Sequence, residues 1–352
     1  MLQSTSRGIQ ISGAFIIISM SSVMIYWNSY QTKSAYITIV NLTRQTTEIS
    51  IKTCLKNPPS LVGHFVFHHF NGTLEDLNNK YQKYKPELGG KFKPLECQER
   101  EKLAIIIPYR DRQRHLVDFL SHMPPMLLRQ RVEFTIFVIE QDPQEKFNRA
   151  LMMNVGYLEA LKQDNYSCFI FHDVDMYPIN DNNIYKCSTS PRHLAVAVEK
   201  WKFRLPFRGY YGGVVAYPKA VIEKTNGFSN LYFGWGGEDD DLGARLAVVG
   251  LKFVRPAAVY GRYATPVHGK DKGNPVSKDR FRLLGNAKSR IWYDGLNSVV
   301  YNVSKIEKKK IYTHIHITVD RQKLEENVKL KKIELEKQHL KSSPLISSDG
   351  VP

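Results

Sequence analysis

The stretch CFIFHDVD, residues 168–175, joins a short apolar run to two aspartates. The run CFIF is typical of a buried strand, and side chains along an extended segment alternate in direction. Asp173 and Asp175 are therefore expected to point the same way, with Val174 packed behind them. Two carboxylates at the carboxyl end of a parallel strand suit a hard cation that bridges diphosphate oxygens, because open α/β sheets bind their ligands there. A pair that only caps a loop is the alternative.

Two further apolar runs precede this stretch, and helical patterns separate them. AIIIP (104–108) and FTIFVI (134–139) are typical of buried parallel strands. Residues 114–123 and 148–162 show helical periodicity. The second helix presents one apolar face, made by Leu151, Val155, Leu158 and Leu161. The alternation predicts an α/β fold with a mostly parallel, Rossmann-style central sheet in a single catalytic domain. No GxGxxG motif follows a strand, which disfavours a dinucleotide-binding enzyme.

The stretch GWGGEDDD, residues 234–241, is the second candidate site. Three glycines around Trp235 permit a tight, mobile backbone and let the flat face of a sugar approach the indole. The four acids that follow, residues 238–241, repel one another, which raises the pKa of at least one and can poise a general base. An acidic helix N-terminus is the alternative, because the helix dipole favours acids there. Both can hold, since residues 242–249 look helical.

The formal net charge of +16 and the four cysteines limit the classes of function. A net basic charge by itself bears on how soluble a protein is and how it associates, but not on its fold. Because no zinc-finger, helix-turn-helix or RNA-binding signature accompanies the charge, no nucleic-acid partner is predicted. The cysteines contain no CxxC pair, which argues against a zinc site or a thioredoxin-like centre. Their even number and wide spacing fit two disulfides in an oxidising compartment, and four free thiols in a cytosolic protein are the alternative.

The N-terminal region favours a membrane anchor. Residues 8–32 contain no charged side chain, and residues 11–27 are mostly apolar, about the length that crosses a bilayer as a helix. A cleaved signal peptide is the alternative, but the run ends in Tyr26 and Trp27, which suit a membrane interface better than a cleavage site. Four N-x-S/T sequons follow the span and favour a lumenal location for the rest of the chain; they begin at Asn41, Asn71, Asn165 and Asn302.

These features divide the chain into five parts. The predicted parts are a cytoplasmic tail (1–8), a transmembrane signal-anchor (9–27), a polar stem (28–53), the catalytic domain (54–320) and a charged tail (321–352). The tail alternates Lys and Glu and is predicted to be either a solvated helix or disordered.

Eight motifs occur in an order that resembles the β-1,4-galactosyltransferase family. In sequence they are IIIPYRDR, FNRALMMNVGYLEAL, FHDVD, PRHLAVA, YYGGVVAYPK, NGFSNLYFGWGGEDDDLGARL, GRY…H and DGLNSV. The similarity spans residues 54–320, and GWGGEDDD together with DVD is its most specific part. The resemblance implies a GT-A-like fold that binds a nucleotide sugar. It also implies a single-pass type II enzyme of the Golgi membrane, with its catalytic domain in the lumen.

The resemblance implies a role for each candidate residue. The UDP-sugar donor would contact Pro108, Arg110, Arg112, Phe147, Arg149, Asp173, Val174, Asp175, Tyr210 and Trp235. The glycan acceptor would contact Tyr210, Gly213, Trp235, Glu238, Asp239 and Asp240. Asp239 would be the catalytic base, with Glu238 assisting, and Mn²⁺ would bind Asp175 and His268. The disulfides would be Cys54–Cys97 and Cys168–Cys187, the second bracing the loop that carries Asp173.

The metal motif departs from the family pattern at one position. By itself, a histidine in a loop rich in Gly, Pro and basic residues, such as His268, is more often solvent-exposed than a metal ligand. The family has a methionine three residues before this histidine, and here that place is Thr265. A thioether is a soft ligand and a hydroxyl a hard one, so the metal preference can shift from Mn²⁺ toward Mg²⁺.

The function implied by the resemblance is an inverting transfer of galactose. UDP-galactose would be the donor, and O4 of a terminal N-acetylglucosamine on glycoprotein or glycolipid glycans the acceptor. Three alternatives stay open: a relative that uses UDP-N-acetylgalactosamine, a relative with a xylose or glucose acceptor, and a catalytically weak, lectin-like paralogue. Tyr210 separates the two donors, because a bulky tyrosine there resembles the galactose-using enzymes.

Overall fold

A computed structural model describes residues 9–11, 14–16, 52–266 and 274–342 of the chain. The chain forms two compact units, residues 1–52 and 53–352. In the first unit, β1 (Ile9–Ile11) and β2 (Ala14–Ile16) form an antiparallel pair where a membrane-spanning helix is predicted. The rest of the predicted anchor, 9–27, and nearly all of the stem lie outside the described residues, so both stay predictions. No helix within the described ranges combines the length and apolar character needed to cross a bilayer.

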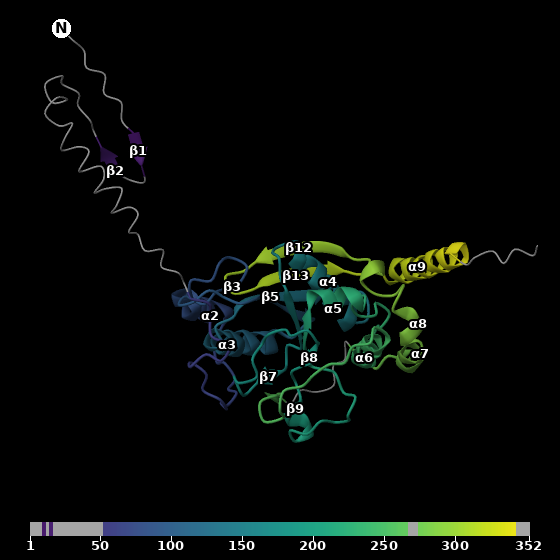
Figure 1. The fold of residues 1–352 in the computed structure, drawn as a ribbon, viewed down its shortest axis with the longest axis horizontal. Coiled ribbons are helices and arrows are strands. Elements are labelled where there is room, and N and C mark those ends of the chain that lie inside the picture. The colour runs from purple at the N-terminus through teal and green to yellow at the C-terminus, as the bar shows by residue number, and fades with distance from the viewer. Residues whose placement is uncertain (1–8, 12–13, 17–51, 267–273, 343–352) are drawn as a thin grey trace, which may run out of the picture. The chain divides into compact units, whose positions relative to one another are not determined.

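The second unit is built on a mixed sheet of eight described strands (Figure 1). Their order is β12-β13-β5-β4-β6-β10-β8, and β3 pairs with β5. The bounds are β3 (Lys91–Phe92), β4 (Lys102–Tyr109), β5 (Glu133–Gln141), β6 (Cys168–His172), β8 (Arg192–His193), β10 (Val214–Pro218), β12 (Asn302–Lys308) and β13 (Thr313–Thr318). A smaller sheet pairs β11 (Arg262–Ala264) with β7 (Tyr177–Pro178) and β9 (Ala197–Val198).

The predicted α/β fold with a parallel core is confirmed. Strands β13, β5, β4 and β6 are parallel neighbours, and Ile105 lies in register with Ile136 on one side and Ile170 on the other. The strands that flank this core are antiparallel, namely β12 against β13, β10 against β6 and β8, and β3 against β5. The sheet is therefore mixed overall and parallel at its centre, where the strands that carry the candidate site lie.

Helices cover both faces of the parallel core. The described α-helices are α2 (Leu74–Tyr81), α3 (Gln113–Arg129), α4 (Arg149–Leu161), α5 (Lys219–Lys224), α6 (Glu238–Val248), α7 (Arg280–Gly285), α8 (Ala287–Arg290) and α9 (Arg321–Ser342), of which α3 and α4 lie on opposite faces. Ile105 and Ile107 of β4 belong to the apolar cluster that contains α3, and Ala104 and Ile106 to the cluster that contains α4. Because both faces of the strand are buried, it appears in sequence as an unbroken apolar run.

Helix α3 extends beyond its expected end, and the charged tail begins as a helix, one of its two predicted alternatives. Helix α3 continues through Pro124 and Pro125 to Arg129 instead of ending at residue 123. Proline removes a backbone donor from a helix, but burial of Met126 and Leu127 keeps this segment against the sheet. The charged tail begins as helix α9, at the yellow end of Figure 1, and its Leu324 lies in the apolar cluster that contains α4. The start of this tail thus packs on the catalytic domain.

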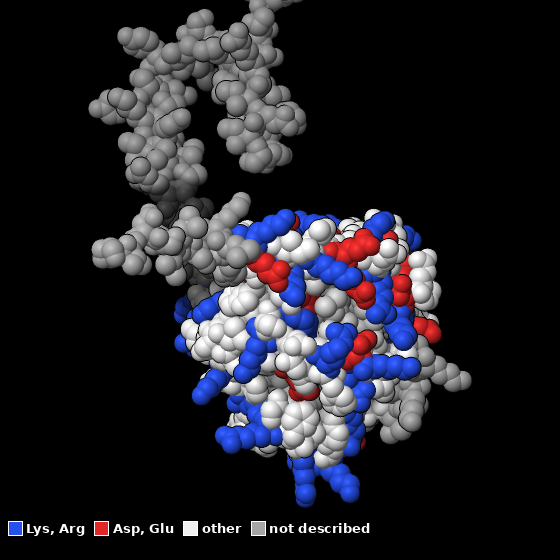
Figure 2. Space-filling view, turned by 90° about the vertical axis from the view of Figure 1, so that its right-hand side faces the viewer, with Lys and Arg blue, Asp and Glu red and all other residues white. Residues whose placement is uncertain are grey.

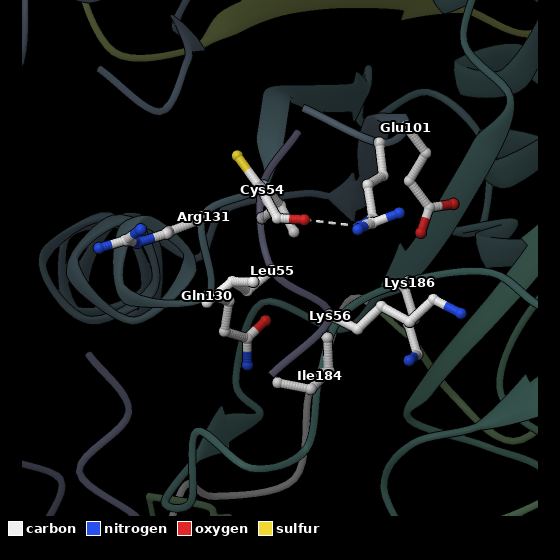
Figure 3. A pocket seen from close by; sticks show the side chains of 10 residues that line it. Cys54, Leu55, Lys56, Glu101, Gln130, Arg131, Ile184 and Lys186 are labelled. Atoms are coloured by element: carbon white, nitrogen blue, oxygen red, sulfur yellow. Dashed lines mark hydrogen bonds between the residues drawn. The ribbon is translucent and has the colours of Figure 1, made fainter. Parts of the chain in front are cut away.

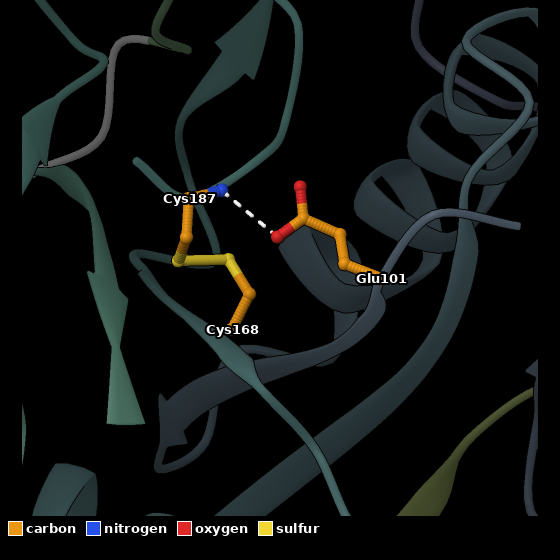
Figure 4. A group of neighbouring side chains, drawn as sticks. All are labelled: Glu101, Cys168 and Cys187. Atoms are coloured by element: carbon orange, nitrogen blue, oxygen red, sulfur yellow. Dashed lines mark hydrogen bonds between the residues drawn. A yellow bond between two sulfur atoms is a disulfide. The ribbon is translucent and has the colours of Figure 1, made fainter. Parts of the chain in front are cut away.

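Both predicted disulfides are present, and all four cysteines are paired. Cys54 bonds to Cys97, and Cys168 bonds to Cys187. The second bond lies at the first residue of β6, the end of the strand opposite Asp173 (Figure 4). It therefore closes the chain loop of residues 168–187, which contains Asp173. Glu101 accepts a hydrogen bond from the backbone N–H of Cys187 over 3.2 Å in the same view.

Candidate active site

The predicted donor residues follow the carboxyl ends of the three central strands. Arg110 follows β4, Phe147 precedes α4 in the connection from β5, and Asp173 follows β6. The guanidinium of Arg110 lies 5.1 Å from the centre of the Phe147 ring and donates to the carbonyl of Glu145 over 2.8 Å. Pro108 is buried in β4, and Val174 is buried in the core, as its alternation with the two aspartates predicts. The parallel strands thus bring the candidate donor-binding side chains to one edge of the sheet.

Arg149 connects two stretches that are far apart in sequence. It opens α4, where the Asn148 side chain caps the helix by accepting from the backbone N–H of Leu151. Its Nε donates to Asp173 over 2.6 Å, and its Nη1 donates to Asp239 over 2.7 Å. The same Nη1 lies 3.3 Å from Glu238. A side chain expected to bind donor therefore also holds three carboxylates of the site in place.

The four consecutive acids separate into two groups because they occupy the first turn of α6. Gly237, at φ 94°, precedes the helix in a left-handed conformation that glycine adopts without strain. Glu238 and Asp239 face Arg149, whereas Asp241 is fully buried. Asp241 accepts from Arg245 over 2.6 Å and also pairs with Arg290 of α8. Asp241 therefore anchors the helix, and the acidic helix start and the candidate base coexist.

The electrostatics of the cluster favour a proton acceptor at Asp239. Burial, together with the charge of Glu238, raises the pKa of Asp239 to about 6, although Arg149 opposes the shift. Burial likewise raises the pKa of Asp173, with Arg149 again opposing the shift. Burial, with the charge of Asp239, also raises the pKa of Asp240. A carboxyl whose pKa approaches neutrality can both accept and release a proton under physiological conditions.

Tyr210 and two glycines form a wall beside Asp239. The Tyr210 ring meets the Trp201 ring edge-on, with ring centres 4.9 Å apart. The Gly213 carbonyl accepts from the backbone N–H of Asp173 over 3.0 Å. Gly212 was not among the predicted residues, yet a Cβ there would lie 2.5 Å from Oδ2 of Asp239 and 2.7 Å from the Tyr210 hydroxyl. The adjacent glycines of YYGG were the available signal, because close approach of backbone to a site excludes larger residues.

We expect Gly212→Ala to lower turnover about 10²-fold, because displacement of a reacting group by about 1 Å costs that much. The added methyl group cannot coexist with the observed Asp239 carboxylate position. Gly209→Ala is the matched control, since a Cβ there meets only the Phe207 ring, at 3.8 Å and 3.9 Å. Steady-state kinetics of both variants provide the measurement. Equal turnover in the two variants would contradict the close approach of Gly212 to the reacting groups.

Trp235 lies on a loop tied to the site by its backbone. Its side chain is 61% exposed. The Trp235 N–H donates to the carbonyl of Pro275 over 2.9 Å, and its own carbonyl accepts from Ser277 over 3.0 Å. The neighbouring Gly234 N–H donates to the carbonyl of Phe147 over 2.9 Å. These bonds connect the loop both to the donor side of the site and to the chain after residue 273.

The described part of the predicted metal site consists of Asp175 and the strand that leads toward His268. Strand β11 runs antiparallel to β7, with Ala264 opposite Tyr177. The N–H of Thr265 donates to Glu199 over 3.2 Å. His268 lies outside the described residues, so its role stays a prediction.

A pocket and a group of possible metal ligands lie outside the candidate site, and both have a structural explanation. A hollow near the first disulfide is lined by Cys54, Leu55, Lys56, Arg100, Glu101, Gln130, Arg131, Val132, Ile184 and Lys186 (Figure 3). It shares no residue with the candidate site, and Arg100 donates to the Cys54 carbonyl within it. Glu101 and the second cysteine pair also lie close together, but those sulfurs are used in a disulfide.

Figure 2 shows Lys and Arg side chains dispersed over one face with Asp and Glu among them, rather than in a single stripe.

The described sequons are accessible. Asn71, Asn165 and Asn302 are all exposed, as glycan attachment requires, and Asn41 lies outside the described residues. Their glycosylation stays a prediction.

Family profiles and known proteins match most of the chain. A family profile described as the N-terminal region of glycosyl transferase group 7 matches residues 54–188, and one described as the N-terminal domain of galactosyltransferase matches residues 192–269. The chain is 42% identical to beta-1,4-galactosyltransferase 2 of Cricetulus griseus over 274 residues, which is 77% of this chain and 73% of the relative. It is 45% identical to beta-1,4-galactosyltransferase 4 of Homo sapiens over 249 residues, 70% of this chain and 71% of the relative.

Two solved structures of a Drosophila β1,4-galactosyltransferase 7 have the same fold. Its catalytic domain in complex with xylobiose aligns with a TM-score of 0.55 at 28% identity, covering 62% of this chain and 94% of that one. A mutant of the same enzyme, in complex with manganese, UDP-Gal and xylobiose, aligns with a TM-score of 0.53 at the same identity and coverage. The two profiles cover the strand ends and the acidic helix start described above, and the relatives are 42% and 45% identical over most of the chain. The chain therefore belongs to the β-1,4-galactosyltransferase family.

Proposed function

We propose that this enzyme transfers galactose from UDP-galactose to O4 of a terminal N-acetylglucosamine, with inversion at the anomeric carbon. The observation that carries the proposal is the Arg149–Asp239 contact of 2.7 Å, which holds a carboxylate of raised pKa beside the donor edge of the sheet. The membership of the family supports β1,4 transfer, and the acceptor sugar is the part that rests on the resemblance alone.

The donor side is assigned to the strand ends. Arg110 and Phe147 already lie against each other, and together they offer a cation and a flat ring to a nucleoside diphosphate. Pro108 and Arg112, at either side of Arg110 in the chain, complete this wall. The positive charges favour departure of UDP because they offset the negative charge that develops on it.

The residues present fit a divalent metal ion beside the diphosphate. Asp175 is partly exposed and is the third residue after β6, and its charge contributes to the raised pKa of Asp173, so the two carboxylates are close. The family resemblance assigns the ligand role to Asp175, with His268 as the second ligand, and Arg149 holds the neighbouring Asp173. A bound Mn²⁺ would supply Lewis-acid stabilisation of the diphosphate oxygens. The manganese and UDP-Gal in the Drosophila relative support this assignment.

The protein groups then carry out one displacement. Asp239 takes the proton from the acceptor O4 hydroxyl as that oxygen forms a bond to the anomeric carbon of galactose. The bond from that carbon to UDP breaks, and its electron pair leaves with UDP, so no covalent enzyme intermediate is required. Glu238 and Asp240 hold the acceptor hydroxyls, and closure of the Trp235 loop excludes water that would hydrolyse the donor. Tyr210 and Gly213 form the wall shared by both sugars.

We expect a donor and acceptor panel to show preference for UDP-galactose with N-acetylglucosamine. Tyr210 crowds the position of the donor 2-substituent, so Tyr210→Leu should narrow or reverse the preference over UDP-N-acetylgalactosamine by enlarging the pocket. The measurement is kcat/KM for both donors with N-acetylglucosamine, xylose and glucose. Tyr260→Leu, at an exposed tyrosine, is the matched control and should leave the donor ratio unchanged. If the wild type preferred the N-acetylated donor, the assignment of galactose as the transferred sugar would be wrong. If it preferred xylose, the assignment of N-acetylglucosamine as the acceptor would be wrong.

We expect activity to survive with Thr265, with weaker Mn²⁺ affinity and relatively better use of Mg²⁺ than in methionine-bearing relatives. Loss of a thioether favours harder, oxygen-rich coordination. Thr265→Met should tighten Mn²⁺ binding and leave acceptor choice unchanged. The substitution should preserve the hydrogen bond from residue 265 to Glu199, because the backbone N–H donates it. Titration of activity against each metal tests this, with Thr53→Met, at an exposed threonine, as control. Identical Mn²⁺ curves would place residue 265 outside the metal shell, whereas activity restored only by methionine would favour the weak paralogue.

We propose further that the enzyme is a single-pass type II protein of the Golgi membrane. The paired cysteines and the exposed sequons support a lumenal catalytic domain. Peptide mapping after glycosidase treatment checks this, since unmodified asparagine at every sequon would count against a lumenal location.

A further inference from the structure

A cluster of potential metal ligands lies outside the candidate active site, where β5 meets β13. Glu140 of β5 is in register with His316 of β13, and His314 precedes His316 by two residues on the same face of the strand. Oε2 of Glu140 lies 2.8 Å from Nε2 of His314 and 3.4 Å from Nδ1 of His316. One ligand atom from each of the three residues lies within 4.8 Å of the others.

A further carboxylate fixes the orientation of one of these histidines. Nε2 of His316 lies 3.1 Å from Oε2 of Glu307, on the neighbouring strand β12. The other oxygen of Glu307 pairs with Lys305 and Lys309 over 2.9 Å and 3.0 Å. If Nε2 carries the proton that Glu307 accepts, the lone pair of Nδ1 faces Glu140. A carboxylate that holds the second nitrogen of a histidine is the usual support of a metal-binding imidazole.

The contact between His314 and Glu140 is unusual for an ordinary ion pair. The His314 side chain is 13% exposed, and its Nε2 is buried without a hydrogen bond of acceptable geometry among the described residues. Nε2 nonetheless lies 2.8 Å from the carboxylate oxygen. Because Nε2 makes no aligned hydrogen bond to Glu140, the nitrogen and the carboxylate oxygen can both turn toward a shared ion. Around a tetrahedral Zn²⁺ with bonds of 2.0–2.2 Å, neighbouring ligand atoms are about 3.3–3.6 Å apart. The contact of 3.4 Å between Glu140 and His316 already has this spacing, whereas the contact of 2.8 Å between Glu140 and His314 must lengthen on binding.

We propose that Glu140, His314 and His316 form a second metal site, which takes Zn²⁺ or a similar divalent transition metal with water in the remaining position. Two imidazoles and one carboxylate are the donor set that suits zinc, whereas the predicted site at Asp175 suits a harder ion beside a diphosphate. Glu307 is a positioning residue that acts through His316.

The position of this site connects the C-terminal hairpin to the catalytic sheet. Its ligands come from β5 and β13, and the supporting carboxylate comes from β12. The His314 ring meets the ring of Tyr109 edge-on, with centres 6.0 Å apart, and Tyr109 directly precedes the donor residue Arg110. Metal binding should therefore hold the hairpin of β12 and β13 against β5, beside the donor site. The unfolding temperature of the protein should rise as the Zn²⁺ concentration increases.

The test uses full-length, untagged protein in detergent, stripped of metal and then saturated with Mn²⁺ and UDP to fill the donor site. Competition of Zn²⁺ against a chromogenic chelator should show one site that is weakened at least 100-fold in His314→Gln and in His316→Gln. Glu307→Gln should weaken it 10- to 100-fold, as loss of a supporting carboxylate does. His69→Gln is the matched control, because His69 forms a lone histidine–carboxylate pair with Asp118 at 2.7 Å, and it should leave the affinity unchanged.

Two outcomes would overturn the proposal. One is an identical Zn²⁺ titration of wild type and the His314→Gln/His316→Gln double variant. The other needs no variant, so it stays decisive if the substitutions prevent folding. Co²⁺ added to the Mn²⁺- and UDP-saturated wild type should give the strong visible absorption of a four-coordinate ion with nitrogen ligands. The weak spectrum of hydrated, six-coordinate Co²⁺ alone would show that the cluster is only a set of ion pairs.

Discussion

Asp239→Asn is expected to lower turnover about 10²-fold or more while UDP binding stays nearly intact, because an amide cannot take the acceptor proton. The amide keeps the size of the carboxylate, and its oxygen can still accept from Arg149, which holds Asp239 at 2.7 Å. The loss should therefore fall on kcat and not on the affinity for UDP. Asp279→Asn is the matched control, since Asp279 is an exposed aspartate that pairs with Arg282 and should be neutral. Turnover of Asp239→Asn within tenfold of wild type would move the base to Glu238 or Asp240.

The pH dependence of the wild type gives an independent check on the same residue. The pKa of Asp239 is raised to about 6 by burial, so the base is charged above that pH and becomes protonated below it. Since the reaction needs the charged form, kcat/KM should fall as pH drops through about 6, whereas an ordinary aspartate would titrate near 4. The residual activity of Asp239→Asn should lack this acid limb. An acid limb that persists unchanged in the variant would assign the titration to another group.

Arg149→Met is expected to reduce the free energy of unfolding by about 3–5 kcal/mol at neutral pH and to remove most activity, because three carboxylates lose their shared cation. Arg149 is 15% exposed and contacts Asp173, Glu238 and Asp239, so its loss leaves negative charges close together in a poorly solvated place. Denaturant unfolding and steady-state kinetics measure the two effects. Arg282→Met, at a surface pair with Asp279, should change stability by about 0.5 kcal/mol or less.

The destabilisation by Arg149→Met should also depend on pH in a known direction. Without the guanidinium, the pKa values of the three carboxylates rise further, since Arg149 lowers each of them in the wild type. At lower pH the carboxylates take up protons in the folded variant, which removes their repulsion. The difference in stability between wild type and variant should therefore shrink as pH falls toward about 5. A difference that stays constant with pH would mean that lost packing, and not charge, is responsible.

Much of the fold was predictable because strands buried on both faces leave continuous apolar runs. The runs that became β4, β5 and β6 are of this kind, and the residues after them could be placed at one edge by the rule for parallel sheets. The antiparallel flank was not predictable, since long-range pairing sets the place of β10 beside β6 and of β8 beside β10. The persistence of α3 through Pro124 depends similarly on burial that local propensity does not reveal.

Within the site, sequence identified the stretches but not the division of labour. The acids at 238–241 are chemically alike, and only the register of α6 and the distant partner Arg290 show that Asp241 is structural. Arg149 was expected at the donor, but its contacts with Asp173 and Asp239 join segments 24 and 90 residues away. The constraint on Gly212 arises from the same convergence, because its neighbour Asp239 comes from another element.

The most direct measurement is the structure of the product. Purified full-length enzyme, supplied with UDP-galactose, N-acetylglucosamine and Mn²⁺, should form a disaccharide whose proton and carbon NMR spectra show a β-configured galactose linked to O4. Asp239→Asn under the same conditions should yield the same product, more slowly. An α-configured product would contradict a single displacement with Asp239 as base. A linkage to another hydroxyl, or hydrolysis of UDP-galactose without transfer, would contradict the proposed placement of the acceptor.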